Sequence, residues 1–343
     1  FSLLQKNIDY NVLIHLCYSV SAFNGENVTK STSNNEFLIN VFMNLFQFLE
    51  MAINNDKNSD VTTNIAMGIT YFCSENSPFL SLYPQLLKTV ILKFVSFLIN
   101  GTQQLKDATI ISLKKILHST QGVIFLDNQG ISIYDEVFNL LPSIIQNLAS
   151  YNLIDFYFAI AIAFHNITDH KGRVNQLILF IKKQFDYVSN NLLNYNIDDY
   201  IQLYTLLKAF LSLSSFCEHE FFDFFSTEYH NFVSLFDFLC DLIKNISKEE
   251  RNNELHEIVI NSKNCIIDIF SHNTFSENGN NELLQEIMNI VYNKFIEDYV
   301  NSPPEDRTYE LLLFFTKCID RSHEELINYQ IIKAKDMSNL CVA

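Results

Sequence analysis

The chain has 343 residues, more than one ordinary domain core needs, so we expect either two packed domains or one elongated array. It contains only seven glycines and five prolines, which leaves too few tight turns for a sheet-rich fold. Hydrophobic residues make up 48% of the chain, enough to exclude disorder for most of its length. A formal charge of −16 argues against direct binding to nucleic acid or to an anionic membrane, and it favours basic protein partners.

The seven cysteines are odd in number, widely spaced and mostly set in apolar surroundings. This pattern is typical of buried thiols in a reducing compartment rather than of a disulfide framework. No run of about 18 apolar residues could span a membrane, and no signal peptide opens the sequence. We therefore expect a soluble, intracellular protein. Because the sequence begins inside an apolar pattern, we also expect it to be a piece of something longer.

Helix-start signals recur along the chain. Ser33 with Glu36 forms a capping box before a long apolar run, and Ser77-Pro78 fits the entry to a helix. The same spacing of Ser and Glu returns at 247 and 250, at 302 and 305, and at 322 and 325. Between these marks the apolar periodicity predicts helices at 9–23, 36–53, 60–74, 82–100, 103–119, 131–149, 153–168, 173–194, 198–216, 220–245, 249–271, 281–300, 305–320 and 324–338.

The predicted starts at 36, 82 and 131 are about 46 and 49 residues apart, slightly above the interval of two-helix HEAT-type repeats. Such hairpins cannot bury their apolar faces alone, so they stack on one another. We expect an all-α fold, an α-solenoid of HEAT-type helical hairpins, with residues 1–343 forming one continuous segment of it.

The sequence offers no set of residues for catalysis. Its glycines are too far apart for a phosphate-binding loop, and no nucleophile stands in a recognisable motif beside a base. The tightest group of possible metal ligands is Cys217-Glu218-His219, and His165 and His170 are five residues apart, which misses the helical spacing of three or four. We expect no enzyme activity, no metal and no cofactor.

Two predicted helices, 36–53 and 82–100, are apolar on two faces. One face of each can pack on the partner helix of its own hairpin, and the second face needs another cover. The second faces consist of Phe42, Phe46, Leu49 and Ile53 on the first helix, and of Leu86, Val90 and Phe97 on the second, with Lys93 among them. Either neighbouring helices cover these faces within the stack, or the faces form a groove that holds an amphipathic peptide.

Three local motifs resemble a known family. They are Leu16-Cys17-Tyr18-Ser19-Val20 followed by Gly25; Phe79-Leu80, then Leu86-Leu87-Lys88-Thr89-Val90 with Lys93 and Phe97; and Asp298-Tyr299, Pro304, Arg307 and 310–312. In this order and spacing they resemble the central part of the exportin-1 family, the receptors for leucine-rich nuclear export signals within the importin-β (karyopherin) superfamily. The resemblance covers nearly all 343 residues, about the middle third of such a receptor, and it is weak from about 150 to 280.

The resemblance implies a groove for export signals of cargo proteins within residues 33–100. By position, the residues that line it would be Phe42, Phe46, Leu49, Ala66, Thr70, Leu86, Val90 and Phe97, with Thr89 and Lys93 as polar contacts to the bound peptide. It also implies binding of the small GTPase Ran in its GTP form, mostly through family segments absent here. Passage through the nuclear pore implies contact with nucleoporins and a location in both nucleus and cytoplasm.

The chain departs from the family at three places. Leu49 stands where many relatives carry a reactive groove cysteine, which predicts resistance to electrophilic export inhibitors. A polar loop at 54–60 replaces a basic one, and Thr70 and Leu86 replace bulkier residues, so the accepted signals should differ. The alternative to a receptor is a generic helical-repeat scaffold without a groove. A receptor with an open slot predicts Phe46 and Phe97 facing solvent, and a scaffold predicts both covered.

Overall fold

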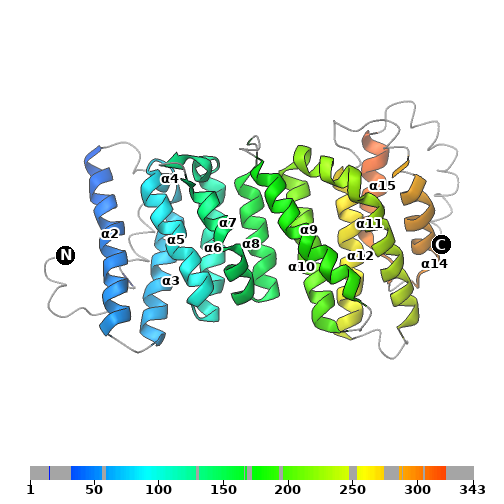
Figure 1. Ribbon diagram of the computed structural model, residues 1–343, viewed down its shortest axis with the longest axis horizontal. Helices are drawn as coiled ribbons and strands as arrows, with labels where there is room; N and C mark the ends of the chain where they lie inside the picture. The colour runs from blue at the N-terminus through cyan, green and yellow to red at the C-terminus, as the bar shows by residue number, and fades with distance from the viewer. Residues whose placement is uncertain are drawn as a thin grey trace. The chain divides into compact units, whose positions relative to one another are not determined.

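The computed structural model is built from helices, and the predicted all-α fold is confirmed (Figure 1). The structure describes residues 15, 32–55, 59–128, 131–165, 167, 172–192, 196–246, 253–273, 286–287, 289–303 and 306–321. These residues fall into two compact units, Phe1–His170 and Lys171–Ala343. A single solenoid running through both units stays a prediction. None of the described helices combines the length and the hydropathy that a membrane crossing requires.

The described part of unit 1 contains three helical hairpins. Its elements are α2 (Thr32–Asn55), α3 (Ser59–Glu75), α4 (Ser77–Leu80), α5 (Pro84–Asn100), α6 (Gln103–Ser119), η2 (Val123–Phe125), β1 (Asp127–Asn128), β2 (Ile131–Ser132), α7 (Ile133–Asn147) and α8 (Ser150–Ala163). The second helices of the hairpins form one layer, because α6 packs against both α3 and α8. In the other layer α5 packs against α7 and is tied to α2 by an ion pair.

The chain between α6 and α7 forms a two-residue antiparallel pair that the sequence did not predict, with Asp127 opposite Ser132. Ser132 then caps α7: its hydroxyl accepts from the Asp135 amide, and the Asp135 carboxylate accepts from the Ser132 amide. This reciprocal pair satisfies two of the amide groups left without partners at a helix start. The last residue of β2, Ser132, is therefore also the N-cap residue of α7.

Helix boundaries follow the predictions closely where polar caps or prolines set them. The 103–119 helix has the predicted bounds and begins after Thr102, whose hydroxyl accepts from the Leu105 amide. The predicted 82–100 helix begins instead at Pro84, after the short α4. α2 begins at Thr32, so Ser33 lies inside the helix rather than ahead of it. The predicted helices at 9–23 and 324–338, apart from His15, and the capping pairs after 246 fall wholly or partly outside the described residues.

Unit 2 repeats the two-layer packing. Its described elements are α9 (Arg173–Asn191), α10 (Ile197–Phe216), α11 (Glu218–Asn245), α12 (Glu254–Asn273), the π-helix η4 (Val291–Ile296), α14 (Glu297–Asn301) and α15 (Tyr309–Arg321). Helix α12 packs against α10 on one side and α15 on the other, and α9 packs against α11 in the second layer.

Aromatic rings fill the interior of unit 2 around Phe210 on α10. Its ring lies edge-on to Phe185 of α9 at a centroid distance of 5.4 Å and edge-on to Phe232 of α11 at 5.7 Å. It stacks on Phe224 at 5.3 Å. Phe210 is fully buried. Because this ring on α10 contacts both α9 and α11, it joins two consecutive hairpins through shape-matched contacts.

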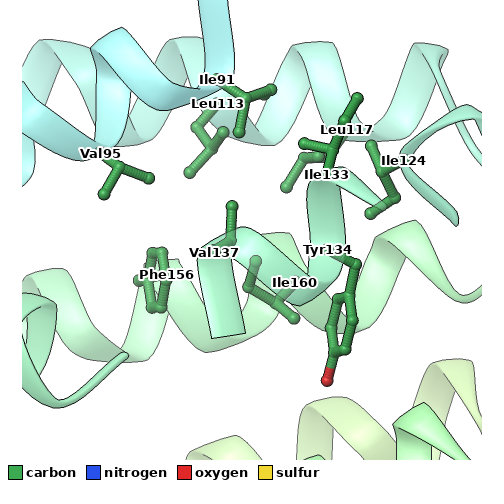
Figure 2. Close-up of a pocket in the computed structure, with 10 residues that line it drawn as sticks. All are labelled: Ile91, Val95, Leu113, Leu117, Ile124, Ile133, Tyr134, Val137, Phe156 and Ile160. Carbon is green, nitrogen blue, oxygen red and sulfur yellow. The ribbon is translucent and has the colours of Figure 1, made fainter. Parts of the chain in front are cut away.

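A small apolar pocket lies inside unit 1 among α5, α6, η2, α7 and α8 (Figure 2). Its lining residues are Ile91, Val95, Leu113, Leu117, Ile124, Ile133, Tyr134, Val137, Phe156 and Ile160. Figure 2 shows the hydroxyl of Tyr134 directed away from the other lining side chains. With no polar group turned inward, this pocket offers packing space rather than a site for chemistry.

Replacing Phe210 by Ala should destabilise unit 2 by about 3–5 kcal/mol, because the cavity left behind is bounded by three helices. Urea unfolding followed by circular dichroism measures the shift in midpoint. Leu179→Ala removes an exposed side chain of α9 and should leave the midpoint almost unchanged. A loss below about 1 kcal/mol for Phe210→Ala would contradict the central role of this ring.

Candidate functional site

The residues expected to line a groove come from the first two hairpins of unit 1. Helix α2 carries Phe42, Phe46 and Leu49; α3 carries Ala66 and Thr70; and α5 carries Leu86, Thr89, Val90, Lys93 and Phe97. These helices belong to neighbouring hairpins, and the region where α2 and α5 approach is called the α2–α5 seam below. The Lys93 ammonium crosses it to Glu50 of α2, at 3.3 Å.

The apolar residues of this set are buried. Phe46 is 7% exposed and Phe97 is 6% exposed, so the prediction that both face solvent in an open slot is wrong for this structure. The other apolar side chains of the set and Thr70 are buried as well. The physical reason is that burying apolar faces removes their surface from water, and aromatic rings of α3 and α4 lie against the second face of α2.

Phe42 shows how the second face of α2 is covered. Its ring centroid lies 4.9 Å from that of Phe72 on α3, and it stacks on Phe79 of α4 at 6.0 Å. Phe79 in turn contacts Tyr83 immediately before α5 at 4.8 Å. The short helix α4 therefore supplies an aromatic bridge from α2 to the start of α5; the sequence predicted a helix entry at Ser77-Pro78 and placed Phe79 in the second family-like motif, but it did not predict this contact.

The polar residues at the seam are engaged locally. The hydroxyl of Thr70 donates to the Met67 carbonyl at 2.8 Å, and that of Thr89 donates to the Gln85 carbonyl at 3.1 Å. Thr89 remains exposed on α5, and Lys93 is half-buried. Of the ten predicted residues, these two are therefore the ones that a partner can reach without any rearrangement.

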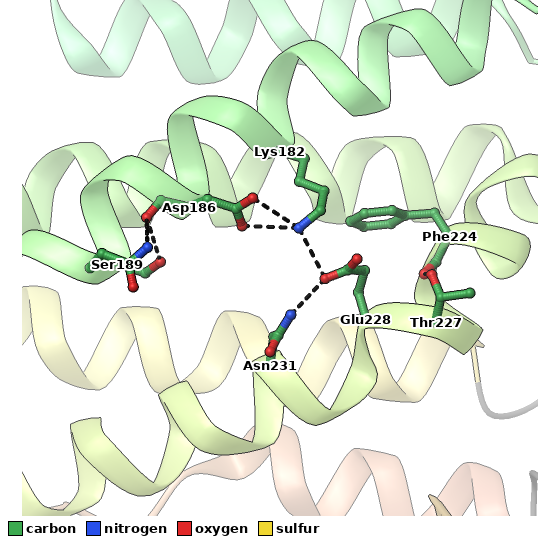
Figure 3. A network of polar contacts seen from close by, with 8 residues as sticks. Lys182, Asp186, Ser189, Phe224, Thr227, Glu228 and Asn231 are labelled. Atoms are coloured by element: carbon green, nitrogen blue, oxygen red, sulfur yellow. Dashed lines mark hydrogen bonds and ion pairs between the residues drawn. The ribbon is translucent and has the colours of Figure 1, made fainter.

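Charged contacts between hairpins escaped the sequence analysis. In unit 2, Lys182 on α9 contacts Asp186 on its own helix and Glu228 on α11, at 2.9 and 3.1 Å (Figure 3). Burial lowers the pKa of Lys182, but the hydrogen bonds to Asp186 and Glu228 outweigh it and the pKa is raised. In the sequence, this contact could have been suspected only from the spacing of Lys182 and Glu228, which are 46 residues or about one repeat apart. That spacing becomes visible only after the repeats are aligned.

Two polar contacts, both largely buried, join α12 to the chain around α14. Lys263 is 1% exposed and lies 2.7 Å from Asp298, which is 12% exposed. Closer to the start of α12, Nε2 of His256 lies 3.2 Å from Oδ1 of Asp306, although the angles do not suit a hydrogen bond between these atoms. Asp298 belongs to the third family-like motif, so that motif serves at least to anchor α14.

The cysteines with described side chains at 73, 217, 240 and 265 are buried. Burial raises the pKa of the Cys265 thiol to about 12, and burial together with Asp298 raises that of Cys240. A folded-state pKa above the unfolded value means that the thiol stabilises the fold below about pH 8.5, and this contribution is lost as the pH rises toward 12. The thiols of Cys240 and Cys265 are therefore protonated and unreactive near neutral pH.

No metal site forms among the described residues. Groups of three or more His, Cys, Asp or Glu side chains close enough to hold a metal ion do not occur there. Cys217 is buried at the start of α11, whereas Glu218 and His219 are exposed, so the three neighbours in sequence do not converge. His170 lies outside the described residues. The chain matches no protein-family model and no curated protein sequence.

In the native protein, an electrophile that attacks thiols should give no adduct within residues 36–100. Leu49 offers no thiol, and Cys73 on α3 is fully buried. Mass spectrometry of peptides from treated native protein tests this expectation, with protein treated in urea as the control in which Cys73 reacts. An adduct on Cys73 under native conditions would show that the interior around α3 opens readily.

Proposed function

We propose that this chain is the signal-binding segment of a nuclear export receptor, which takes up leucine-rich export signals of cargo proteins at the α2–α5 seam. The main support is that the residues matching the family's signal-binding helices fall on the first helices of two neighbouring hairpins, joined across the seam by Lys93 and Glu50. Binding would be promoted by Ran in its GTP form, and the receptor would shuttle between nucleus and cytoplasm through contacts with nucleoporins.

The chemistry of the seam fits spaced apolar anchors. Phe46, Val90 and Phe97 present aromatic and branched surfaces for Leu, Ile, Phe or Met side chains. Four or five such anchors contribute about 1.5–3 kcal/mol each. Association and the ordering of a free peptide cost much of this, which leaves micromolar-scale affinity. Weak binding suits a receptor that has to release its cargo.

The proposal requires the seam to open, because its apolar residues are covered in this structure. Helix α3 packs closely against α6 in the second layer, whereas the described link between α2 and α5 is the exposed ion pair of Lys93 with Glu50. Opening would thus separate α2 from α5 while α3 and α6 act as the hinge. A closed majority state lowers the apparent affinity for a peptide, and Ran would raise it by favouring the open state.

A scaffold without a groove is the second candidate. It is favoured by one observation, the burial of Phe46 and Phe97 at 7% and 6% exposure, which is what lateral packing in a repeat stack predicts. Such a scaffold would bind partners on exposed surfaces and would not respond to an export-signal peptide.

Binding of a fluorescent leucine-rich export-signal peptide to the full-length protein, with and without Ran in its GTP state, tests the proposal. Phe97→Ala should weaken binding about tenfold or more, because it removes one anchor surface. Ile91→Ala is the control, since Ile91 is also buried on α5 but lines the pocket toward α6 and α7. It costs similar stability and should leave peptide affinity unchanged.

Glutamate at Val90, a fully buried position, would disrupt folding and is therefore a poor probe. If the wild type fails to bind the peptide even with Ran in its GTP state, the receptor proposal is wrong and the scaffold stands. If Ile91→Ala and Phe97→Ala weaken binding equally, the peptide binds away from the seam.

A further inference from the structure

The hairpin formed by α5 and α6 is unusually rich in lysine. Residues 84–119 contain five lysines and a single acidic residue, Asp107, in a chain with an overall charge of −16. We call this hairpin the cationic hairpin. Each of its five ammonium groups contacts an oxygen of a neighbouring hairpin; the lysines are 88, 93, 106, 114 and 115.

Two of these lysines reach back to the preceding hairpin. Lys93 of α5 contacts Glu50 of α2 at 3.3 Å, and Lys115 of α6 contacts Glu75 at the end of α3 at 2.7 Å. The first contact lies in the α2, α5 and α7 layer and the second in the α3, α6 and α8 layer. The preceding hairpin is therefore held in both layers.

The other three lysines reach forward to the following hairpin. Lys88 of α5 pairs with Glu136 of α7, and Lys114 of α6 pairs with Asp155 of α8 at 2.6 Å. Lys106 donates to the backbone carbonyl of Asn147 at the end of α7. The following hairpin is also held in both layers, so the cationic hairpin lies between two hairpins that each supply carboxylates.

These pairs are exposed enough for dissolved salt to weaken them. Their side chains are between 23% and 62% exposed. The screening length falls from about 10 Å at 0.1 M salt to about 3 Å at 1 M, so exposed pairs lose attraction over this range. The apolar contacts of α5 with α7 and of α6 with α3 and α8 do not weaken in this way. Added salt therefore weakens the ion pairs between neighbouring hairpins without weakening their apolar contacts, so the two contributions can be measured separately.

We propose that the cationic hairpin acts as a charge clamp that sets the stiffness of the three-hairpin stack in unit 1 and makes it depend on ionic strength. Because the pairs occur in both layers, weakening them softens bending toward either layer. The apolar packing keeps the hairpins together while this happens. The inference rests on the contacts alone and holds whether or not the chain is an export receptor.

The buried pair in unit 2 provides an internal comparison. Lys263 and Asp298, at 1% and 12% exposure, join α12 to α14 with little access for dissolved ions. Buried pairs are screened much less than exposed ones. Salt should consequently affect protection from hydrogen exchange in the hairpins flanking α5 and α6 more strongly than in α12.

Hydrogen–deuterium exchange of the full protein, followed by mass spectrometry at 0.05 M and 0.8 M NaCl, measures this difference. In the wild type, amides of α3, α7 and α8 should exchange roughly three- to thirtyfold faster at high salt, given the usual strength of exposed pairs. The clamp variant Glu75→Gln, Glu136→Gln, Asp155→Asn should exchange fast already at low salt and respond little to added salt.

A variant with the same change in net charge serves as the control. Glu36→Gln, Asp223→Asn and Glu257→Gln neutralise exposed carboxylates for which the described part of the chain shows no cation partner. This variant should behave as the wild type does. The proposal is overturned if wild-type exchange in α3, α7 and α8 is independent of salt, or if the control variant loses the salt response as the clamp variant does. The wild-type salt titration remains decisive even if a variant folds poorly.

Discussion

The structure depends on helices that are apolar on two faces. Helix α5 buries Leu87, Ile91 and Phe94 on one face and Val90 and Phe97 on another. One partner helix cannot cover both faces, so each hairpin needs a neighbour, and repeated need for a neighbour produces a stack. The same requirement explains the packing of α12 between α10 and α15 in unit 2. Two-layer packing thus follows from helices that are apolar on two faces. The loops need only be short and polar, because they do not determine how the helices pack.

This constraint also explains how far the sequence could predict the molecule. Periodicity identified the helices, and the 103–119 helix has its predicted bounds, since a cap such as Thr102 acts within one turn. The 82–100 helix begins two residues later than predicted, at Pro84. Periodicity identified the second faces of α2 and α5 as well. Whether those faces meet each other or solvent depends on the distance between two hairpins, which the interposed helix α4 and its Phe79 help to set. Nothing in either helix alone encodes that distance, so the sequence left open whether Phe46 and Phe97 are exposed, as an open slot requires, or covered, as they are in the structure.

Charged contacts were invisible for a related reason. Lys114 and Asp155 belong to different repeats, and each residue alone looks like an ordinary solvated position on a helix. The buried pair of Lys263 with Asp298 is the more demanding case, since removing both charges from water costs several kcal/mol per ion unless each finds its partner (about 20 kcal/mol in the idealised limit). Asp298 also accepts a long hydrogen bond of 3.4 Å from the Ser302 hydroxyl at the end of α14. Asp298 is therefore needed for contacts to Lys263 and Ser302 that exist only in the folded chain, so the sequence alone could not show its role.

The closed seam and the proposed uptake of a peptide are compatible on energetic grounds. Opening exposes Phe46 and Phe97 to water, at about 25 cal/mol for each Å² of apolar surface. A bound peptide covers that surface again, so the exchange of one apolar cover for another is close to neutral. What remains is the cost of ordering the peptide, set against any further apolar area that its anchors bury. A receptor built in this way would hold its ligand weakly, and a small bias on the proposed hinge between α3 and α6 would then decide between loading and release.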